Sequence, residues 1–243
     1  MDRANIPQII LIVPVHNEAA NLWDEIVHVV ENSADYPYSH IMLIENGSTD
    51  DSFKISKDLE KIYPHKVFAF KEENKGIGYA YFRGMVEAYK MFKKDDYWLV
   101  LSAADMPFKN TDINYFIGNN IYTKCDLAIG SKAHRDSVTN YTFKRKMMST
   151  IFYLIRKIIL GMKTVDCQGT IFIHSKDLDY IIKNIVARNF FFSTELTYLI
   201  EKRKQKVIEM PIVLKPEIRP STVRPLKDGM NMLKQTFNLF LKN

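Results

Sequence analysis

Residues Gln8–Val15 read QIILIVPV and are followed directly by the polar residues His16, Asn17 and Glu18. A short apolar run rich in β-branched residues is typical of a strand buried on both faces of a sheet. Residues Asn21–Val30 follow with apolar side chains at helical spacing. The sequence therefore predicts a central strand, a polar loop and a helix.

The same order of strand and helix recurs through the first half of the chain. Further strands are predicted at Ile41–Ile44, Lys66–Phe70, Tyr97–Leu101 and Asp126–Gly130, and helices at about Asp51–Ile62, Gly78–Phe92 and Asp112–Ile121. Strands that alternate with helices of about 10–15 residues indicate right-handed βαβ units. We therefore expect an α/β fold with a mainly parallel central sheet flanked by helices.

The second half of the chain departs from this regular alternation. Residues 132–140 are polar and predict a loop. Helices are predicted at Phe143–Met162, Lys176–Ile185, Thr194–Lys204 and Pro225–Leu241, and strands near Thr170–His174 and at Val207–Leu214. Since single domains commonly reach about 250 residues, we expect the 243 residues to form one domain.

The composition is that of a packed globular protein, with 47% hydrophobic and 12% aromatic residues. The two cysteines, Cys125 and Cys167, fit neither a disulfide framework nor a zinc site, and we expect both to be small core residues in a reducing compartment. The apolar stretch at 9–15 is too short for a signal peptide, and Arg156 and Lys157 interrupt a later apolar stretch. We therefore expect a cytoplasmic protein without a membrane-spanning helix.

Charge is distributed unevenly along the chain. Residues 1–130 contain 13 Lys and Arg against 19 Asp and Glu, whereas residues 131–243 contain 21 against 9. A half with a net charge of +12 beside one of −6 indicates an anionic partner for the second half, and phosphate, nucleic acid and anionic lipid all fit. No nucleic-acid-binding module is recognisable, so we do not expect a nucleic-acid partner.

Three polar clusters follow directly after predicted strands, at Pro14–Glu18, Glu45–Asp50 and Ser102–Pro107. Each alone is what an ordinary turn would show. In a parallel sheet, however, the carboxyl ends of the strands lie at one edge, where ligands bind. The three clusters are therefore predicted to converge on one site.

Together and in this order, these clusters and four further segments resemble the family 2 glycosyltransferases, in particular the branch of dolichol-phosphate mannosyltransferase and glucosyltransferase. The segments are IVPVHNE (12–18), IENGSTDDS (44–52), NKGIGYAYFRGM (74–85), LSAADMPF (101–108), DCQGTIF (166–172), FSTELTYLIEKRKQKVIEMPI (192–212) and RPSTVRPLKDGMNML (219–233). The resemblance implies a GT-A-like (nucleotide-diphospho-sugar transferase) fold. It further implies a nucleotide-binding half at about 1–131 and an acceptor-side half at about 132–243.

The resemblance also implies which residues surround the donor nucleotide. They are Pro14, His16, Glu18, Glu45, Asn46, Lys75 and Ser102. Glu45 and Asn46 stand where relatives usually have two aspartates, so the sequence leaves UDP-sugar and GDP-sugar both open. The glycines at 76 and 78 are expected to let a charged ligand approach the start of the following helix.

Asp105 is the residue on which the predicted chemistry depends. In the resembling family an Asp-x-Asp motif holds a Mg²⁺ or Mn²⁺ ion that bridges the diphosphate, and Asp105 matches its last carboxylate, with Ala103 at the position of the first. Because Mg²⁺ often binds through one or two carboxylates plus phosphate oxygens, Asp105 can still serve as metal ligand and catalytic residue. Taken alone, Asp105 would be better explained as a helix N-terminal or turn residue before Pro107, and the surrounding motifs reverse that preference.

The acceptor side is assigned in the same way. The resemblance implies catalytic or sugar-orienting roles for Asp166 and Glu195, and substrate contacts for Lys132, Arg145, Gln168, Arg219 and Ser221. The basic residues suit an acceptor phosphate, although a solvated basic face explains them equally well. Glu195 would be a general base for a hydroxyl acceptor, would only orient the sugar for a phosphate acceptor, or would simply stand in the first turn of a helix.

These expectations define two functions. The first is an inverting glycosyltransferase that moves a sugar from a UDP- or GDP-sugar to a polyprenyl phosphate or another lipid-linked or surface glycan acceptor, with Mg²⁺ or Mn²⁺ as cofactor. The alternative, which Ala103 keeps open, is a catalytically weak nucleotide-sugar-binding scaffold subunit of a glycan-assembly complex. The amphipathic helices at 143–162 and 225–241 would suit peripheral contact with the inner face of the membrane, or ordinary core packing.

Overall fold

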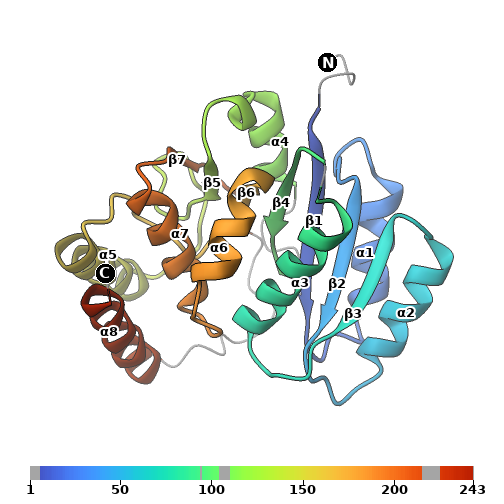
Figure 1. Cartoon of the computed structure of the whole chain (residues 1–243), viewed down its shortest axis with the longest axis horizontal. Helices are drawn as coiled ribbons and strands as arrows, with labels where there is room; N and C mark the ends of the chain where they lie inside the picture. Colours follow the sequence, from blue (N-terminus) through green and yellow to red (C-terminus); the bar gives the residue numbers. More distant parts are fainter. Residues whose placement is uncertain (1–5, 94, 104–109, 215–224, 243) are drawn as a thin grey trace.

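The computed structural model describes residues 6–93, 95–103, 110–214 and 225–242. Its centre is a seven-stranded sheet with the strand order β3-β2-β1-β4-β6-β5-β7 (Figure 1). The strands are β1 (Gln8–Val15), β2 (His40–Glu45), β3 (Val67–Lys71), β4 (Tyr97–Leu101), β5 (Leu127–Gly130), β6 (Ile171–His174) and β7 (Val207–Met210). Every predicted strand is present, and β1 lies between β2 and β4, at the centre that its apolar run predicted.

The sheet is mainly parallel, as expected, with one reversal that the sequence did not predict. β1 pairs in parallel with β2 and β4, β2 with β3, and β5 with β7. β6 runs antiparallel to β4 and β5, with Ile171 opposite Leu101 and Ile129. Because β6 is reversed, it begins at the edge where β4 and β5 end. The segment that precedes β6 therefore reaches the same edge as the carboxyl ends of the parallel strands.

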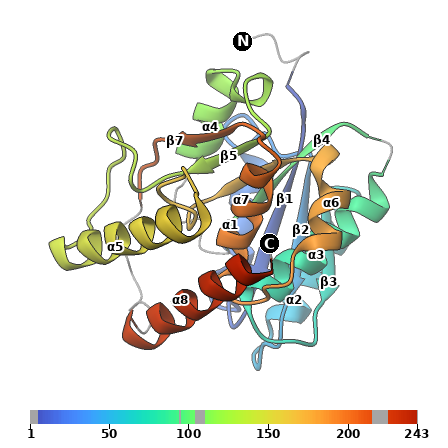
Figure 2. The ribbon, with the colours of Figure 1, turned by 60° about the vertical axis from the view of Figure 1, so that its left-hand side comes forward.

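Helices cover both faces of the sheet (Figures 1 and 2). They are α1 (Leu22–Glu31), α2 (Ser52–Ile62), α3 (Ile77–Met91), α4 (Thr111–Gly118), α5 (Phe143–Leu160), α6 (Leu178–Asn184), α7 (Phe192–Lys202) and α8 (Pro225–Leu241), with 3-10 turns at Ile121–Thr123 and Ser175–Asp177. The helices α1, α2 and α4 supply buried residues to one face, and α3, α6 and α7 to the other. In the part of the chain described, no helix is both long and apolar enough to cross a bilayer.

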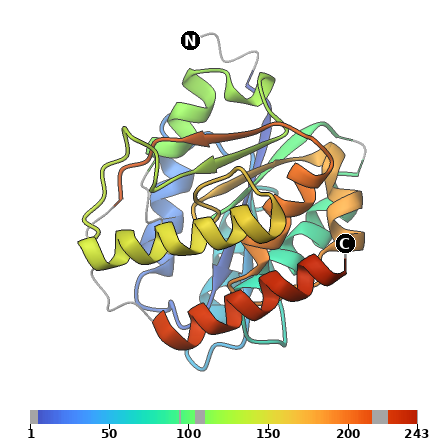
Figure 3. The same ribbon diagram turned by 90° about the vertical axis from the view of Figure 1, so that its left-hand side faces the viewer.

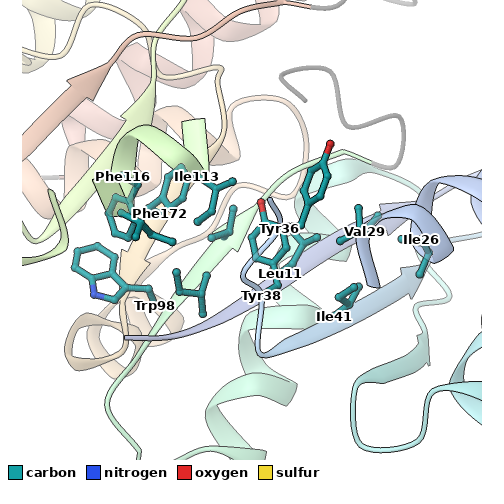
Figure 4. Packing of buried hydrophobic residues seen from close by; sticks show 14 of the residues in the cluster. Leu11, Ile26, Val29, Tyr36, Tyr38, Ile41, Trp98, Ile113, Phe116 and Phe172 are labelled. Carbon is teal, nitrogen blue, oxygen red and sulfur yellow. The ribbon is translucent and has the colours of Figure 1, made fainter. Parts of the chain in front are cut away.

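Two apolar cores form, one on each face of the sheet. In β1, Ile9, Leu11 and Val13 enter the first core, and Ile10 and Ile12 enter the second. Because successive side chains of a strand point to opposite faces, a strand covered on both sides needs an uninterrupted apolar run. Figure 4 shows the first core, where aromatic side chains from β4, α4 and β6 pack against one another.

Asp112, in the first turn of α4, is an ionisable group buried next to this core. Burial raises the pKa of Asp112 to about 6, although the nearby Thr170 hydroxyl and the hydrogen bond from the Ile113 amide oppose the rise. The reference pKa of the carboxyl is 3.8, so the folded protein binds this proton more tightly than the unfolded chain. The contribution of Asp112 to stability is thus greatest below about pH 4 and falls by about 3 kcal/mol as the pH rises to about 6.

We predict that Asp112→Asn raises the free energy of unfolding at neutral pH by about 1–3 kcal/mol and leaves it nearly unchanged at about pH 4. The amide stays neutral and can still accept the hydrogen bond from the Ile113 amide, which is 2.7 Å long in the native protein. Chemical unfolding of both proteins between about pH 4 and pH 7 measures the difference. A difference that does not grow with pH would contradict the raised pKa.

Candidate active site

The first two polar clusters lie side by side at the carboxyl ends of β1 and β2. Val15 pairs with Glu45 in the parallel register, and the amide of Asn46 donates to the carbonyl of Val15 at 3.0 Å. Nδ1 of His16 lies 3.1 Å from the carbonyl oxygen of Asn46. Pro14 pairs with its neighbour in β2 in the same register. The residues predicted to surround the nucleotide at this end of the sheet are therefore neighbours.

Hydrogen bonds between the two loops fix their relative position. Asn17 has a left-handed backbone with a φ of 55°, and its Oδ1 accepts a hydrogen bond from the amide of Thr49 at 2.8 Å. Asparagine tolerates this backbone conformation and bonds readily to nearby amides. The amide of Glu18 donates to Ser52 Oγ at 2.8 Å. The loops are thus held together by the protein itself, without a ligand.

Two carboxylates hold these turns. Glu45 is buried and accepts a hydrogen bond from the amide of Ser48. Asp50 accepts from the amides of Ala19 and Ser52, at 3.1 and 3.0 Å. Burial tends to raise the pKa of Asp50, but these bonds and one from Ser52 Oγ outweigh it, so the pKa lies below its usual value. Asp50 is therefore an ionised anchor of the loop at neutral pH.

Asn46 has a side-chain acceptor that the described residues leave without a hydrogen bond. Its Nδ2 donates to the carbonyl of Gly76 at 3.1 Å, while the buried Oδ1 has no such partner among them. Buried polar atoms are normally satisfied, so this oxygen is suited to a ligand N–H or hydroxyl. Lys75 lies close by, because a Cβ built on Gly47 would be 2.9 Å from Lys75 Cγ. The nucleotide-binding roles of these residues stay predictions.

The glycines at 76 and 78 pack closely against another part of the chain. A Cβ built on Gly78 would lie 2.4 Å from the carbonyl carbon of Arg188, and one on Gly76 would lie 3.0 Å from the Arg188 carbonyl oxygen. The Cβ side of Gly78 is therefore filled by the chain's own backbone. The expected approach of a charged ligand to the start of this helix stays a prediction. The missing side chain lets the start of α3 pack closely against the segment before α7.

Glu195 lies buried in the first turn of α7. Its Oε2 accepts hydrogen bonds from the amides of Val186 and Ala187, at 3.2 and 2.6 Å. These amides precede Arg188, whose guanidinium lies 3.7 Å from the centre of the Phe82 ring. Glu195 thus fixes the segment that packs against α3. Its catalytic role stays a prediction, and one of its oxygens already makes two bonds.

The end of β4 carries the candidate metal-binding segment. The amide of Ser102 donates to the carbonyl of Ile12 at 3.1 Å, and its carbonyl accepts from the hydroxyl of Tyr81 at 3.0 Å. Asp105 lies outside the described residues. Within the described ranges, no group of three or more His, Cys, Asp or Glu is arranged to hold a metal ion. The binding of a cation by Asp105 and by phosphate oxygens of the donor, the hard oxygen ligands that Mg²⁺ prefers, stays a prediction.

Three predicted acceptor-side residues meet at the same edge of the sheet. Nζ of Lys132 lies 3.4 Å from Oδ2 of Asp166 and donates to the carbonyl of Gln168 at 2.5 Å. Asp166 accepts hydrogen bonds from the amides of Lys132 and Gln168, both at 2.8 Å. The structure therefore joins residues of the segment after β5 to residues of the segment before β6.

The segment that carries Asp166 is held by charged side chains that the sequence analysis did not single out. Glu201 accepts hydrogen bonds from the amides at 163 and 164, and Glu209 from the amides at 165 and 166. The buried guanidinium of Arg156 donates to the carbonyl of Val165 at 2.7 Å. The sequence signal that could have identified these residues is a charged residue within an apolar strand or helix. Such a charge is rarely buried without a partner, so it indicates a specific contact.

Both cysteines are buried and free, as expected. Burial raises the pKa of the Cys125 and Cys167 thiols to about 12. At Cys167 the neighbouring guanidinium of Arg156 opposes this rise without reversing it. Because the thiolate is the reactive form, neither cysteine is a nucleophile at neutral pH.

The other predicted substrate residues lie in the later part of the chain. Arg145 is in the first turn of α5, and its guanidinium lies 4.0 Å from the centre of the Tyr141 ring. Arg219 and Ser221 lie outside the described residues. Contacts of these three residues with a substrate stay predictions.

A mainly parallel central sheet with polar loops after β1, β2 and β4, and with β6 reversed, is a GT-A-like fold. The model of Glycosyl transferase family 2 matches residues 10–181. The chain belongs to this family, which confirms the resemblance that its motifs indicated.

Individual relatives agree with this assignment. The chain is 27% identical over 218 residues to UDP-N-acetylglucosamine–dolichyl-phosphate N-acetylglucosaminyltransferase of Methanococcus voltae, covering 84% of each chain. It is 26% identical over 202 residues to dolichol-phosphate mannosyltransferase of Pyrococcus furiosus, covering 83% of this chain and 54% of that protein. The fold matches the crystal structure of glucosyl-3-phosphoglycerate synthase from Mycobacterium tuberculosis with Mn²⁺, UDP-glucose and phosphoglyceric acid. That match has a TM-score of 0.64 at 15% identity and covers 97% of this chain and 79% of the other.

Proposed function

We propose that this glycosyltransferase moves a sugar from a UDP- or GDP-sugar to a polyprenyl phosphate, with inversion at the anomeric carbon. The proposal is supported by the residues that meet at one edge of the sheet. Reversed β6 brings the Lys132–Asp166 pair to the edge where β1 and β2 end in the loops of His16 and Asn46. The two archaeal relatives, which are named for dolichyl phosphates, support this class of acceptor. Residues 1–243 would act as one unit, with the nucleotide on the side of 1–131 and the acceptor on the side of 132–243.

The proposed reaction needs no general base, because a phosphate acceptor arrives as an anion. One acceptor oxygen attacks the anomeric carbon while the bond from that carbon to the donor diphosphate breaks, and the electron pair leaves with the nucleoside diphosphate. Lys132 would bind the acceptor phosphate, and Asp166 would hold Lys132 in place. Asp105 would hold Mg²⁺ or Mn²⁺, which would supply positive charge for the leaving diphosphate.

The function is tested by incubating radiolabelled UDP- and GDP-sugars with a polyprenyl phosphate and with membrane extract, each with and without Mn²⁺. Metal-dependent label in the polyprenyl product is the expected result. Transfer only to another component of the extract would show that the acceptor class is wrong. Metal-coupled nucleotide binding in calorimetry, without transfer to any acceptor, would instead support the scaffold function.

A lipid acceptor requires a protein surface that meets the membrane, and we assign that role to α5 and α8. These helices pack against each other on the β7 side of the molecule (Figures 1 and 3). Of the seventeen large hydrophobic residues exposed in the described chain, ten lie on them: Phe143, Met147, Ile151, Leu154, Ile158, Met230, Leu233, Phe237, Phe240 and Leu241. On α5 they form one stripe, at steps of three or four residues. Apart from the buried Arg156, the same helix has four Lys and Arg and no Asp or Glu, which complements an anionic leaflet on the cytoplasmic side.

We predict that the double variant Phe143→Gln/Ile158→Gln binds vesicles of anionic phospholipid at least about tenfold more weakly than the native protein. The two side chains are 83% and 80% exposed, so their replacement should leave the fold intact. Vesicle sedimentation measures the effect. Ile62→Gln, an exposed apolar residue at the end of α2, is the matched control and should bind like the native protein. Unchanged binding by the double variant would contradict the membrane surface, and loss of self-association would indicate a second copy instead.

A further inference from the structure

Lys132 and Asp166 come from segments that only tertiary contacts bring together. Lys132 follows β5, whereas Asp166 lies in the segment before β6. Their side chains are 14% and 12% exposed, and both oxygens of Asp166 accept amide hydrogen bonds, one from Lys132 and one from Gln168. The Lys132 ammonium therefore keeps a fixed position only while the two segments keep their spacing.

Glu209 contacts both segments from β7, which pairs in parallel with β5. Its Oε1 accepts hydrogen bonds from Ser131 Oγ at 2.7 Å and from the amide of Asp166 at 3.0 Å. Its Oε2 accepts from the amide of Val165 at 2.9 Å. One carboxylate thus ties the residue before Lys132 to the residue that forms its ion pair.

A carboxylate is the side chain that these contacts require. All three partners are donors, so an acceptor-only group satisfies them, whereas glutamine would place an N–H donor against one of them. Hydrogen bonds to a charged acceptor are also stronger than neutral ones. The rest of the segment is held independently by Glu201 and Arg156. Losing the Glu209 contacts should therefore loosen residues 165–166 without releasing the whole segment.

We propose that Glu209 is a positioning residue for the acceptor phosphate. It acts through the Lys132–Asp166 pair, which it keeps at the spacing that receives the phosphate. The inference rests on the proposed function for the identity of the acceptor. The contacts of Glu209 are independent of that identity, so the two can fail separately.

The Glu209→Gln variant tests the positioning role. The KM for a short-chain polyprenyl phosphate is expected to rise about tenfold, while the KM for the nucleotide sugar stays within about twofold of the native value. Hydrogen exchange at the amides of Val165 and Asp166 is expected to become faster. A merely structural role would lower the melting temperature and change both KM values together. That result, or an unchanged acceptor KM, would overturn the proposal.

Glu60→Gln is the matched control. Glu60 also accepts a backbone hydrogen bond, from the amide of Ala69 at 2.8 Å, but it does so next to β3 at the opposite edge of the sheet. Its replacement should leave both KM values as they are. Should Glu209→Gln not fold, Ser131→Ala removes one of the three contacts and is expected to raise the acceptor KM about threefold, with the nucleotide-sugar KM unchanged. An unchanged acceptor KM in that variant would also count against the proposal.

A failure of the proposed function would give a different result from a failure of the Glu209 proposal. If the native protein transfers no sugar to polyprenyl phosphate, the acceptor class is wrong, and titration with inorganic phosphate then tests the ion pair directly. The probe is the chemical shift of the Lys132 amide. Phosphate binding about tenfold weaker in Glu209→Gln supports the role of Glu209, and equal binding in both proteins overturns it.

Discussion

Replacing Asp105 by alanine is expected to lower metal-dependent sugar transfer by at least about a hundredfold. The reason is the composition of the motif, since Ala103 leaves no carboxylate at the first position to take over as ligand. A divalent cation beside the negatively charged leaving diphosphate stabilises the transition state of such reactions by several kcal/mol. The measurement is the initial rate at saturating donor and acceptor during a titration with Mn²⁺.

Asp24→Ala is the control for this variant, because Asp24 is an exposed aspartate of α1, and it should transfer sugar at the native rate. Calorimetry with the nucleotide, with and without Mn²⁺, separates loss of metal coupling from loss of folding. An Asp105→Ala protein that keeps most of its turnover would refute the metal role of Asp105. It would also remove the main support for the metal-dependent mechanism.

The largest expected effect on stability is that of Gly169→Ala, which should lower the free energy of unfolding by about 3 kcal/mol or more. A Cβ at Gly169 would lie 1.6 Å from the carbonyl oxygen of Gly130 and 2.8 Å from its carbonyl carbon. Both obstacles are backbone atoms, and the amide of Gly130 is held by the carbonyl of Thr170 at 2.8 Å. The clash therefore cannot be relieved by rotating a side chain, and β5 and the start of β6 must move apart.

Gly229→Ala provides the opposite result. A Cβ at Gly229, inside α8, would meet none of the described atoms within 4 Å. Since alanine is the better helix former, this change should raise the free energy of unfolding by up to about 1 kcal/mol. Chemical unfolding of both variants measures the contrast. Equal stability of Gly169→Ala and the native protein would show that β5 and β6 are not packed as closely as described.

Part of the candidate site followed from the sequence because parallel strands align their ends. His16, Glu45 and Asn46 each follow or end a predicted strand, and the parallel register brings them together. Nothing comparable in the sequence joins Glu195 to the amides of Val186 and Ala187. Those contacts depend on how α7 packs, so the first-turn position of Glu195 was predictable while its partners were not.

The fold class, the order of elements and the family all follow from the amino-acid sequence alone. These depend on patterns that are local in the chain: the apolar run at 8–15, the helical spacing after it, and contiguous motifs. The strand Tyr97–Leu101 and the helix Pro225–Leu241 have the predicted bounds. α7 begins and ends two residues before its predicted bounds. It begins earlier because its first turn includes the buried Phe192, which the predicted helix left out.

Long-range packing sets the direction of β6, the close contact of Gly78 with Arg188, and the side chains that hold the segment before β6. The Glu209 contact with Val165 joins residues 44 positions apart. No periodicity of a single helix or strand specifies such a partner, because the free energy that selects it comes from closing the whole sheet and burying both of its faces at once.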